Sequence, residues 1–131
     1  MRTLLDTHAF LWARRAPNRL GSQRQLVEDP ATVRLVSTVT AWEIAIKWST
    51  RRLGLPEHPA QFVPSRIRLL AATSVAIELP HVLAVADLPL HHRDPFDRLL
   101  IAQARALGVP ILTADRAFEA YDVELLMISP P

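Results

Sequence analysis

The feature that most constrains this chain is an alternation of short aliphatic or β-branched runs with longer segments of helical pattern. Such an alternation favours βαβ units, in which parallel strands form one sheet and helices cover it. We predict strands over residues 2–5, 33–37, 74–78, 110–113 and 124–128. We predict helices over residues 7–15, 21–28, 40–52, 60–72, 80–86, 95–107 and 115–121. The expected fold is a three-layer α/β domain that takes in all of residues 1–131.

Glycine and proline punctuate three of these helices. Gly54 and Gly108 each follow a predicted helix, and a glycine just past the last turn is a common helix end. Pro64 falls inside the predicted helix 60–72, where proline is disfavoured. We therefore expect Pro64 to mark the first turn of that helix or a break in it.

Four acidic residues stand where a predicted strand gives way to a helix or where a helix begins. They are Asp6, Glu43, Asp97 and Asp115. If the strands are parallel, these junctions share one edge of the sheet, where open α/β folds bind ligands. Two carboxylates ~4 Å apart repel by roughly 1 kcal/mol in water and about 4 kcal/mol near a protein surface. A hard divalent cation with oxygen ligands removes this repulsion, so the pattern predicts a Mg²⁺ site that handles phosphates.

Each acid also has a purely structural interpretation. Asp6 and Asp115 stand where they could simply cap the following helices. Glu43 follows Thr40 at the spacing of a capping box, and it could also pair with Lys47 one turn later. In isolation, the structural interpretation is preferred for Glu43.

The segment Asp94-Pro95-Phe96-Asp97 separates the two interpretations best. Proline is favoured at the first position of a helix, which makes Asp94 the natural N-cap. Asp97 then lies in the same first turn without being needed as a cap, so it is the better metal ligand. Thr113 adds a hydroxyl near the same edge of the sheet, where it could orient a ligand or a water.

Composition narrows the function classes. The absence of cysteine excludes disulfides, thiolate catalysis and Cys-ligated zinc, and three glycines leave no Gly-rich phosphate loop. Fourteen of the fifteen basic residues are arginine, which suits phosphate contacts, although GC-rich coding produces the same bias. The sequence has neither a signal-type apolar start nor an apolar run of ~18–20 residues. A cytoplasmic protein without a membrane segment is the expectation.

Four motifs in order give the chain a resemblance to a known family. They are Leu4-Leu5-Asp6-Thr7-His8, Trp42-Glu43-Ile44-Ala45-Ile46-Lys47, the run 94–104 (Asp-Pro-Phe-Asp-Arg-Leu-Leu-Ile-Ala-Gln-Ala) and Leu112-Thr113-Ala114-Asp115. Together they resemble the PIN-domain ribonucleases, specifically the VapC-type toxins of bacterial toxin–antitoxin pairs. The resemblance spans nearly the whole chain. It implies a five-stranded parallel sheet, RNA cleavage dependent on Mg²⁺ or Mn²⁺, a homodimer, and inhibition by a VapB-like antitoxin, with which the toxin could assemble on operator DNA.

Matched position by position, the acidic quartet of that family falls on Asp6, Glu43, Asp97 and Asp115. We expect all four to be catalytic and to form the metal site, with Glu43 ordering the metal or the attacking water. A metal-activated water would cut the phosphodiester bond and leave a 5′-phosphate and a 3′-hydroxyl. The side chains expected to contact the substrate are Thr7, Arg98, Thr113 and Arg116, with Arg51 as a further rim candidate.

Other interpretations remain open at this stage. A phosphoryl-receiver domain also gathers acids around Mg²⁺, but it needs an acid pair after the first strand, where Asp6 is followed by Thr7-His8. A haloacid-dehalogenase phosphatase would need an Asp at His8. The last alternative is a non-catalytic RNA- or partner-binding module. His91 and His92 are expected in a surface loop, solvated or contacting RNA, and the tryptophans Trp12, Trp42 and Trp48 in the core or a dimer interface.

Overall fold

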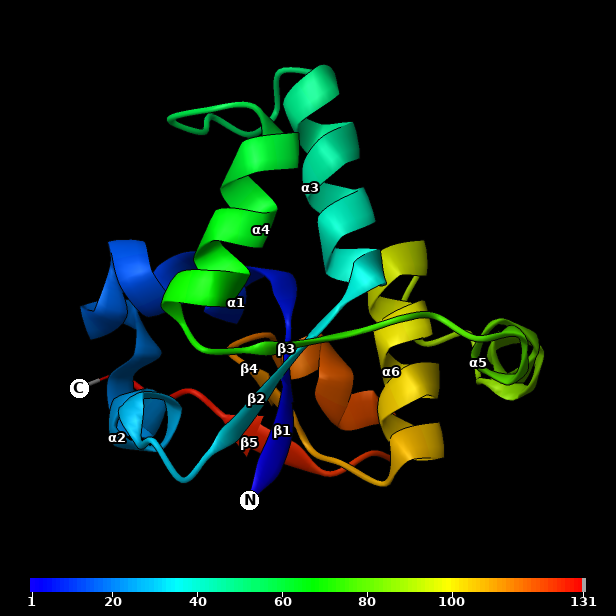
Figure 1. Cartoon of the computed structure of the whole chain (residues 1–131). Coiled ribbons are helices and arrows are strands. Elements are labelled where there is room, and N and C mark those ends of the chain that lie inside the picture. The colour runs from blue at the N-terminus through cyan, green and yellow to red at the C-terminus, as the bar shows by residue number, and fades with distance from the viewer. Residues whose placement is uncertain (131) are drawn as a thin grey trace.

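A single parallel sheet organises the chain, and the computed structural model describes residues 1–130 of it. The strands are β1 (Arg2–Leu5), β2 (Val33–Ser37), β3 (Thr73–Val75), β4 (Ile111–Thr113) and β5 (Leu125–Met127). They pair in the order β3-β2-β1-β4-β5, and every pairing is parallel (Figure 1). The predicted five-stranded parallel sheet is confirmed, although β3 at its edge ends at Val75, three residues earlier than expected.

Helices fill the connections between the strands. Over residues 1–130 the α-helices are α1 (Thr7–Arg15), α2 (Arg24–Glu28), α3 (Thr38–Ser49), α4 (Pro59–Leu69), α5 (Leu79–Ala84) and α6 (Pro95–Leu107). Three 3₁₀ segments join them, namely η1 (Pro17–Gln23), η2 (Val85–Asp87) and η3 (Arg116–Ala120). The helix predicted over 21–28 is therefore divided between η1 and α2, and the one predicted over 115–121 is 3₁₀ rather than α.

Alternation along the central strands builds two hydrophobic cores, one on each face of the sheet. Leu4 points into a core with α6 and η3, whereas its neighbour Leu5 points into a core with α1, α2, α3 and α4. The same division holds for consecutive residues of the adjacent strands, Leu35 and Val36 in β2 and Ile111 and Leu112 in β4. Because successive side chains of a strand face opposite sides, both faces need covering helices. The three-layer prediction is confirmed.

The strand order reverses at the centre of the sheet. From β1 the chain proceeds to β2 and β3 on one side, and it then returns to add β4 and β5 on the other. The carboxyl ends of β1 and β4 therefore flank a topological switch point, the place where open α/β sheets bind ligands. Asp6 follows β1 directly, and Asp115 lies two residues after β4.

Two predicted helix features are wrong. Helix α4 starts with Pro59 at its first position and continues through Pro64 without a break. Packing of Phe62 and Val63 into the core outweighs the loss of one backbone hydrogen bond at Pro64. Helix α3 ends at Ser49, and Arg51, with φ 60°, takes the left-handed position that we had expected near Gly54.

The other glycine end is confirmed, because Gly108 closes α6 in the left-handed conformation with φ 67° and ψ 37°. Within residues 1–130, no helix is both long enough and apolar enough to cross a membrane.

Candidate active site and metal centre

Asp6 occupies the junction between β1 and α1. It is the N-cap of α1, where its Oδ1 accepts a hydrogen bond of 2.8 Å from the Ala9 amide. Its Oδ2 accepts a hydrogen bond of 2.5 Å from the Thr113 hydroxyl at the end of β4. The side chain is thus a helix cap, as the structural interpretation held, and it also lies at the switch point between β1 and β4.

The charge on Asp6 is disfavoured in the folded protein. Burial raises the pKa of the Asp6 carboxyl, and the nearby Asp115 carboxylate raises it further. The hydrogen bonds from Thr113 and Ala9, together with the positive charge of His8, act in the opposite direction. A buried carboxyl that is costly to ionise is typical of a functional site.

Glu43 does not cap its helix. Helix α3 begins at Thr38 and is capped by Ser37, so the capping box predicted from Thr40 is wrong. Glu43 lies in the second turn and is only 2 % exposed. Its Oε1 accepts a hydrogen bond of 2.6 Å from the Thr7 hydroxyl, and its Oε2 lies 2.5 Å from the Lys47 ammonium. Two partners therefore hold this carboxylate in one orientation.

Asp97 lies in the first turn of α6, where Asp94 supplies the cap as predicted. The Asp94 carboxylate accepts from the amides of Phe96 and Asp97. Asp97 Oδ2 is 2.8 Å from Nε2 of His92. Burial raises the pKa of Asp97 to about 7; the charges of Asp94 and Glu43 add to the rise, while His92 opposes it.

Asp115 is the exposed member of the quartet. Its carboxylate caps η3 by accepting a hydrogen bond of 2.9 Å from the Ala117 amide. Its own amide donates to the Thr113 hydroxyl oxygen at 3.0 Å, and that same hydroxyl donates to Asp6. Thr113 therefore links the two acids that flank the switch point.

The structure brings the predicted quartet to one edge of the sheet in two coupled pairs. Asp115 acts on the charge of Asp6, and Glu43 acts on the charge of Asp97. Carboxylate oxygens that repel one another in this way fit a hard cation such as Mg²⁺ or Mn²⁺. Over residues 1–130, the one group with three potential ligand atoms within 4.8 Å of one another is His92, Asp94 and Asp97. The quartet itself is spread more widely than this group.

Two residues that we expect to contact the substrate, Thr7 and Thr113, are buried instead of exposed. Their hydroxyls donate to Glu43 and Asp6. These hydroxyls orient the two acids instead of facing solvent.

Arg98 is likewise not at the rim. It is 9 % exposed, and its guanidinium donates to the Tyr121 hydroxyl and to three backbone carbonyls, those of Val85, Leu88 and Pro89. The predicted phosphate contact by Arg98 is therefore wrong: α6 turns this side chain inward, where it satisfies the carbonyls of the preceding loop.

His92 and Tyr121 are site residues that the sequence did not reveal. The Tyr121 hydroxyl accepts a hydrogen bond of 2.8 Å from the His92 amide. This contact fixes the loop before α6 so that the His92 ring reaches Asp97. The expected loop position of His91 and His92 is confirmed, but the His92 ring is partly buried against Asp97 instead of fully solvated, and contact with RNA stays a prediction. The position of His92 five residues before Asp97 was the available signal, but a loop has no fixed spacing that would have decided the contact.

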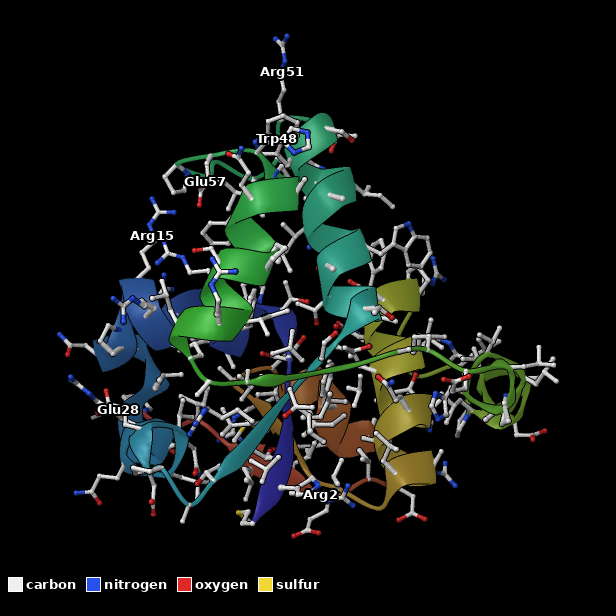
Figure 2. The ribbon with its side chains drawn as sticks, in the orientation of Figure 1. Arg2, Arg15, Glu28, Trp48, Arg51 and Glu57 are labelled. Atoms are coloured by element: carbon white, nitrogen blue, oxygen red, sulfur yellow. The ribbon has the colours of Figure 1, made fainter. Side chains whose placement is uncertain are left out.

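Of the two remaining arginines predicted to contact the substrate, Arg116 lies next to the acidic residues and Arg51 does not. Arg116 is exposed beside Asp115 and pairs with Glu119 at 3.1 Å, so it stays a candidate for phosphate binding. Arg51 lies beyond the end of α3, and Figure 2 shows its side chain pointing away from the rest of the molecule. Trp48 is 37 % exposed in the same region, and Trp42 is 51 % exposed against Phe96. Of the three tryptophans, Trp12 packs against a core as expected, whereas packing of Trp42 and Trp48 in a dimer interface stays a prediction.

Comparison with known sequences agrees with this geometry. The PIN domain family profile matches residues 3–124. Ribonuclease VapC16 from Mycobacterium tuberculosis (strain ATCC 25618 / H37Rv) is 32 % identical to this chain over 68 residues. The aligned region is 52 % of this chain and spans about half of that relative, 48 %.

Solved structures share the fold. A chain of VapBC2 from Rickettsia felis, bound to a DNA fragment from its promoter, superposes with a TM-score of 0.72 at 13 % identity, covering 98 % of this chain and 100 % of that one. A chain of DNA-bound VapBC from Salmonella typhimurium gives 0.70 at 14 % identity, covering 98 % and 99 %. A chain of FitAB bound to an IR36 DNA fragment gives 0.63 at 19 % identity, covering 95 % and 94 %.

Proposed function

The chain belongs to the PIN domain family, and from this premise we propose that it is a metal-dependent endoribonuclease toxin of the VapC type. The observation that carries the proposal is the position of Asp6. Its carboxylate is buried at the switch point of the sheet, oriented by Thr113 and within electrostatic reach of Asp115. The partial match to Ribonuclease VapC16 supports the same activity.

The acids divide the work according to their surroundings. Asp6, Asp97 and Asp115 would hold Mg²⁺ or Mn²⁺, directly or through water. When bound, the metal polarises a phosphate and lowers the pKa of a bound water. Glu43, held by Thr7 and Lys47, would order the metal or accept a hydrogen bond from the attacking water. Arg116 would bind a flanking phosphate. Attack by water would leave a 5′-phosphate and a 3′-hydroxyl.

The partners follow from the same premise. The Rickettsia and Salmonella structures are toxin–antitoxin assemblies on DNA, which supports a VapB-like antitoxin and a hetero-oligomer on operator DNA for this chain. A homodimer and a cytoplasmic location complete the proposal.

A non-catalytic PIN module that only binds RNA or a partner is the main alternative. Such a module has no need for two aspartates, Asp6 and Asp97, whose charged forms the fold disfavours. The raised pKa values of Asp6 and Asp97 therefore support catalysis. A phosphoryl receiver is less well supported, because Asp6 has no acidic neighbour at position 7 or 8.

Incubation of the purified chain with structured RNA tests the proposal. We expect scission with added Mg²⁺ and none with EDTA. The variant Asp6→Asn keeps the helix cap and should lose cleavage. RNA that remains intact with Mg²⁺ and with Mn²⁺, or that is cut equally by Asp6→Asn, contradicts the nuclease function.

A further inference from the structure

A cavity adjoins the catalytic edge on the side of Asp115. Its volume is about 530 Å³, and its wall includes Trp12, Asn18, Arg19, Arg116 and the last two described residues, Ser129 and Pro130. Ala114 and Arg116, the two neighbours of Asp115 in sequence, both line it. The cavity is therefore next to Asp115, at one side of the acidic quartet.

The fold builds this cavity with specific contacts. The η1 segment is tied to the chain end, because the Ser22 amide donates to the Ser129 carbonyl at 2.9 Å and the Ser129 amide donates to the Ser22 hydroxyl at 3.0 Å. Gly21 permits this approach. Its φ is +48°, and a Cβ at this position would lie 1.8 Å from the Ser129 carbonyl oxygen. A side chain other than glycine would push the two walls apart.

The walls combine flat π surfaces with positive charge. The Trp12 ring supplies the flat surface of the wall, and the Arg19 guanidinium lies 4.5 Å from its centroid. His8, which does not line the cavity, stacks on Trp12 with the ring centroids 5.6 Å apart. Arg19 and Arg116 both face the cavity, and the described residues that line it include no carboxylate. Asn18 adds an amide that can both donate and accept hydrogen bonds.

This combination matches a nucleotide better than it matches other ligands. Proteins bind unpaired bases by stacking them on aromatic rings or on arginine planes, and they bind the adjoining phosphates with arginine. A nearby anionic peptide would find the arginines but would make no use of the flat surfaces. A nucleobase with its phosphate uses both.

We propose that this cavity binds one nucleotide of single-stranded RNA next to the scissile phosphate, with its base against Trp12 and Arg19 and its phosphate on Arg116. The inference rests on the proposed nuclease function and adds to it a base-binding subsite formed by these residues.

Binding of labelled RNA tests the inference separately from cleavage. The probes are fluorescein-labelled octamers U₈ and A₈ and an octamer of the same charge in which every base is missing. The full chain carries Asp97→Asn, so that the RNA stays intact while Kd is measured by anisotropy in Mg²⁺. We expect U₈ or A₈ to bind about tenfold more tightly than the abasic octamer.

That preference for bases should disappear in Trp12→Leu and shrink in Arg19→Gln, which is an exposed change that leaves the core intact. Trp12→Phe should restore it. The matched controls, Trp48→Leu at the end of α3 and Arg105→Gln in the last turn of α6, should keep it. If Trp12→Leu and Arg19→Gln, folded by circular dichroism, bind U₈, A₈ and the abasic octamer as their parent does, the inference is overturned. In that case RNA scission by the wild-type chain would still uphold the nuclease function.

Discussion

The Thr113 hydroxyl at the end of β4 donates a hydrogen bond of 2.5 Å to Oδ2 of Asp6 at the end of β1. The two residues are 107 positions apart in sequence and become neighbours because β1 and β4 pair in parallel, with Leu5 opposite Leu112. This bond joins the two sides of the switch point. It orients a carboxylate whose charge the fold disfavours.

Removal of this hydroxyl should impair cleavage more than folding. Thr113→Val keeps the shape of the side chain but removes the hydrogen bond that most favours the charged form of Asp6, leaving the one from the Ala9 amide, so the pKa of Asp6 should rise further. We expect at least a tenfold loss of Mg²⁺-dependent RNA cleavage near neutral pH, with partial recovery at higher pH. Thr113→Ser retains the hydroxyl and should stay close to wild type. Equal activity of the valine and serine variants would show that the bond has no role in catalysis.

Neutralisation of Asp97 should stabilise the metal-free protein. Its pKa is raised from 3.8 to about 7, so folding favours the protonated form. The stability contributed by this group is present below pH 3.8 and is lost as the pH rises toward 7. At pH 8 in EDTA we expect Asp97→Asn to unfold with a free energy about 1–3 kcal/mol higher than wild type. Urea denaturation at pH 5 and pH 8 measures this difference, which should be smaller at pH 5.

The same shift predicts the pH dependence of metal binding. A cation must displace the proton from Asp97, so its affinity should rise with pH and level off above about 7. Isothermal titration with Mn²⁺ from pH 5.5 to 8.5 measures the affinity, and buffers of different ionisation enthalpy report the protons released. An affinity that does not change with pH would mean that Asp97 is not a ligand.

Loss of the buried guanidinium at position 98 should destabilise the fold. Arg98→Met leaves the carbonyls of Leu88 and Pro89 without the donor that they have here, and it removes one of the two donors to the Val85 carbonyl and to the Tyr121 hydroxyl. Unpaired buried acceptors cost about 1–3 kcal/mol each. We expect a loss of roughly 3 kcal/mol or more in the free energy of unfolding. Arg105→Gln, a surface change on the same helix, should stay within about 0.5 kcal/mol of wild type. Similar effects of the two changes would contradict the role assigned to Arg98.

Gly21 should tolerate no side chain. Gly21→Ala would place a Cβ 1.8 Å from the Ser129 carbonyl oxygen at a φ of +48°, so η1 and the chain end must separate. We expect a destabilisation of about 2 kcal/mol or more. Gly54→Ala is the matched control, because a Cβ there meets no atom within 4 Å. Thermal melts of the two variants would give equal midpoints if the contact between Gly21 and Ser129 were absent.

Helix ends could be predicted from the sequence where a capping residue alone determines them. Asp94-Pro95 identified the start of α6, and Gly108 identified its end, because both are capping preferences within one turn. The start of α3 differs from the prediction because Ser37 and Thr40 are both residues that cap helices well, and in the structure the Ser37 hydroxyl accepts from the Val39 amide. The backbone preference of proline predicts a helix start or a break at Pro64. In the structure Pro64 lies inside α4, where its neighbours Phe62 and Val63 are buried.

The candidate site divides in the same way. The four acids could be assigned from their places at strand and helix ends, which parallel pairing brings to one edge. The roles of Arg98 and His92 could not, because each depends on contacts with Tyr121 in another part of the chain. Thr7 and Thr113 lie at the predicted edge of the sheet, but their hydroxyls donate to Glu43 and Asp6 instead of facing the substrate. The sequence does not reveal which acid each hydroxyl contacts.

Cleavage by charge-neutral variants of the two most buried aspartates of the site is the most direct test of the central claim. A defined single-stranded RNA is incubated with wild type, Asp6→Asn, Asp97→Asn and the control Asp87→Asn, each with Mg²⁺ and with EDTA. The convergence of carboxylates on one metal predicts Mg²⁺-dependent cutting by wild type and Asp87→Asn, and a loss of at least 100-fold, on the order of a catalytic group's contribution, in both site variants. Undiminished cleavage by Asp6→Asn or Asp97→Asn would contradict it.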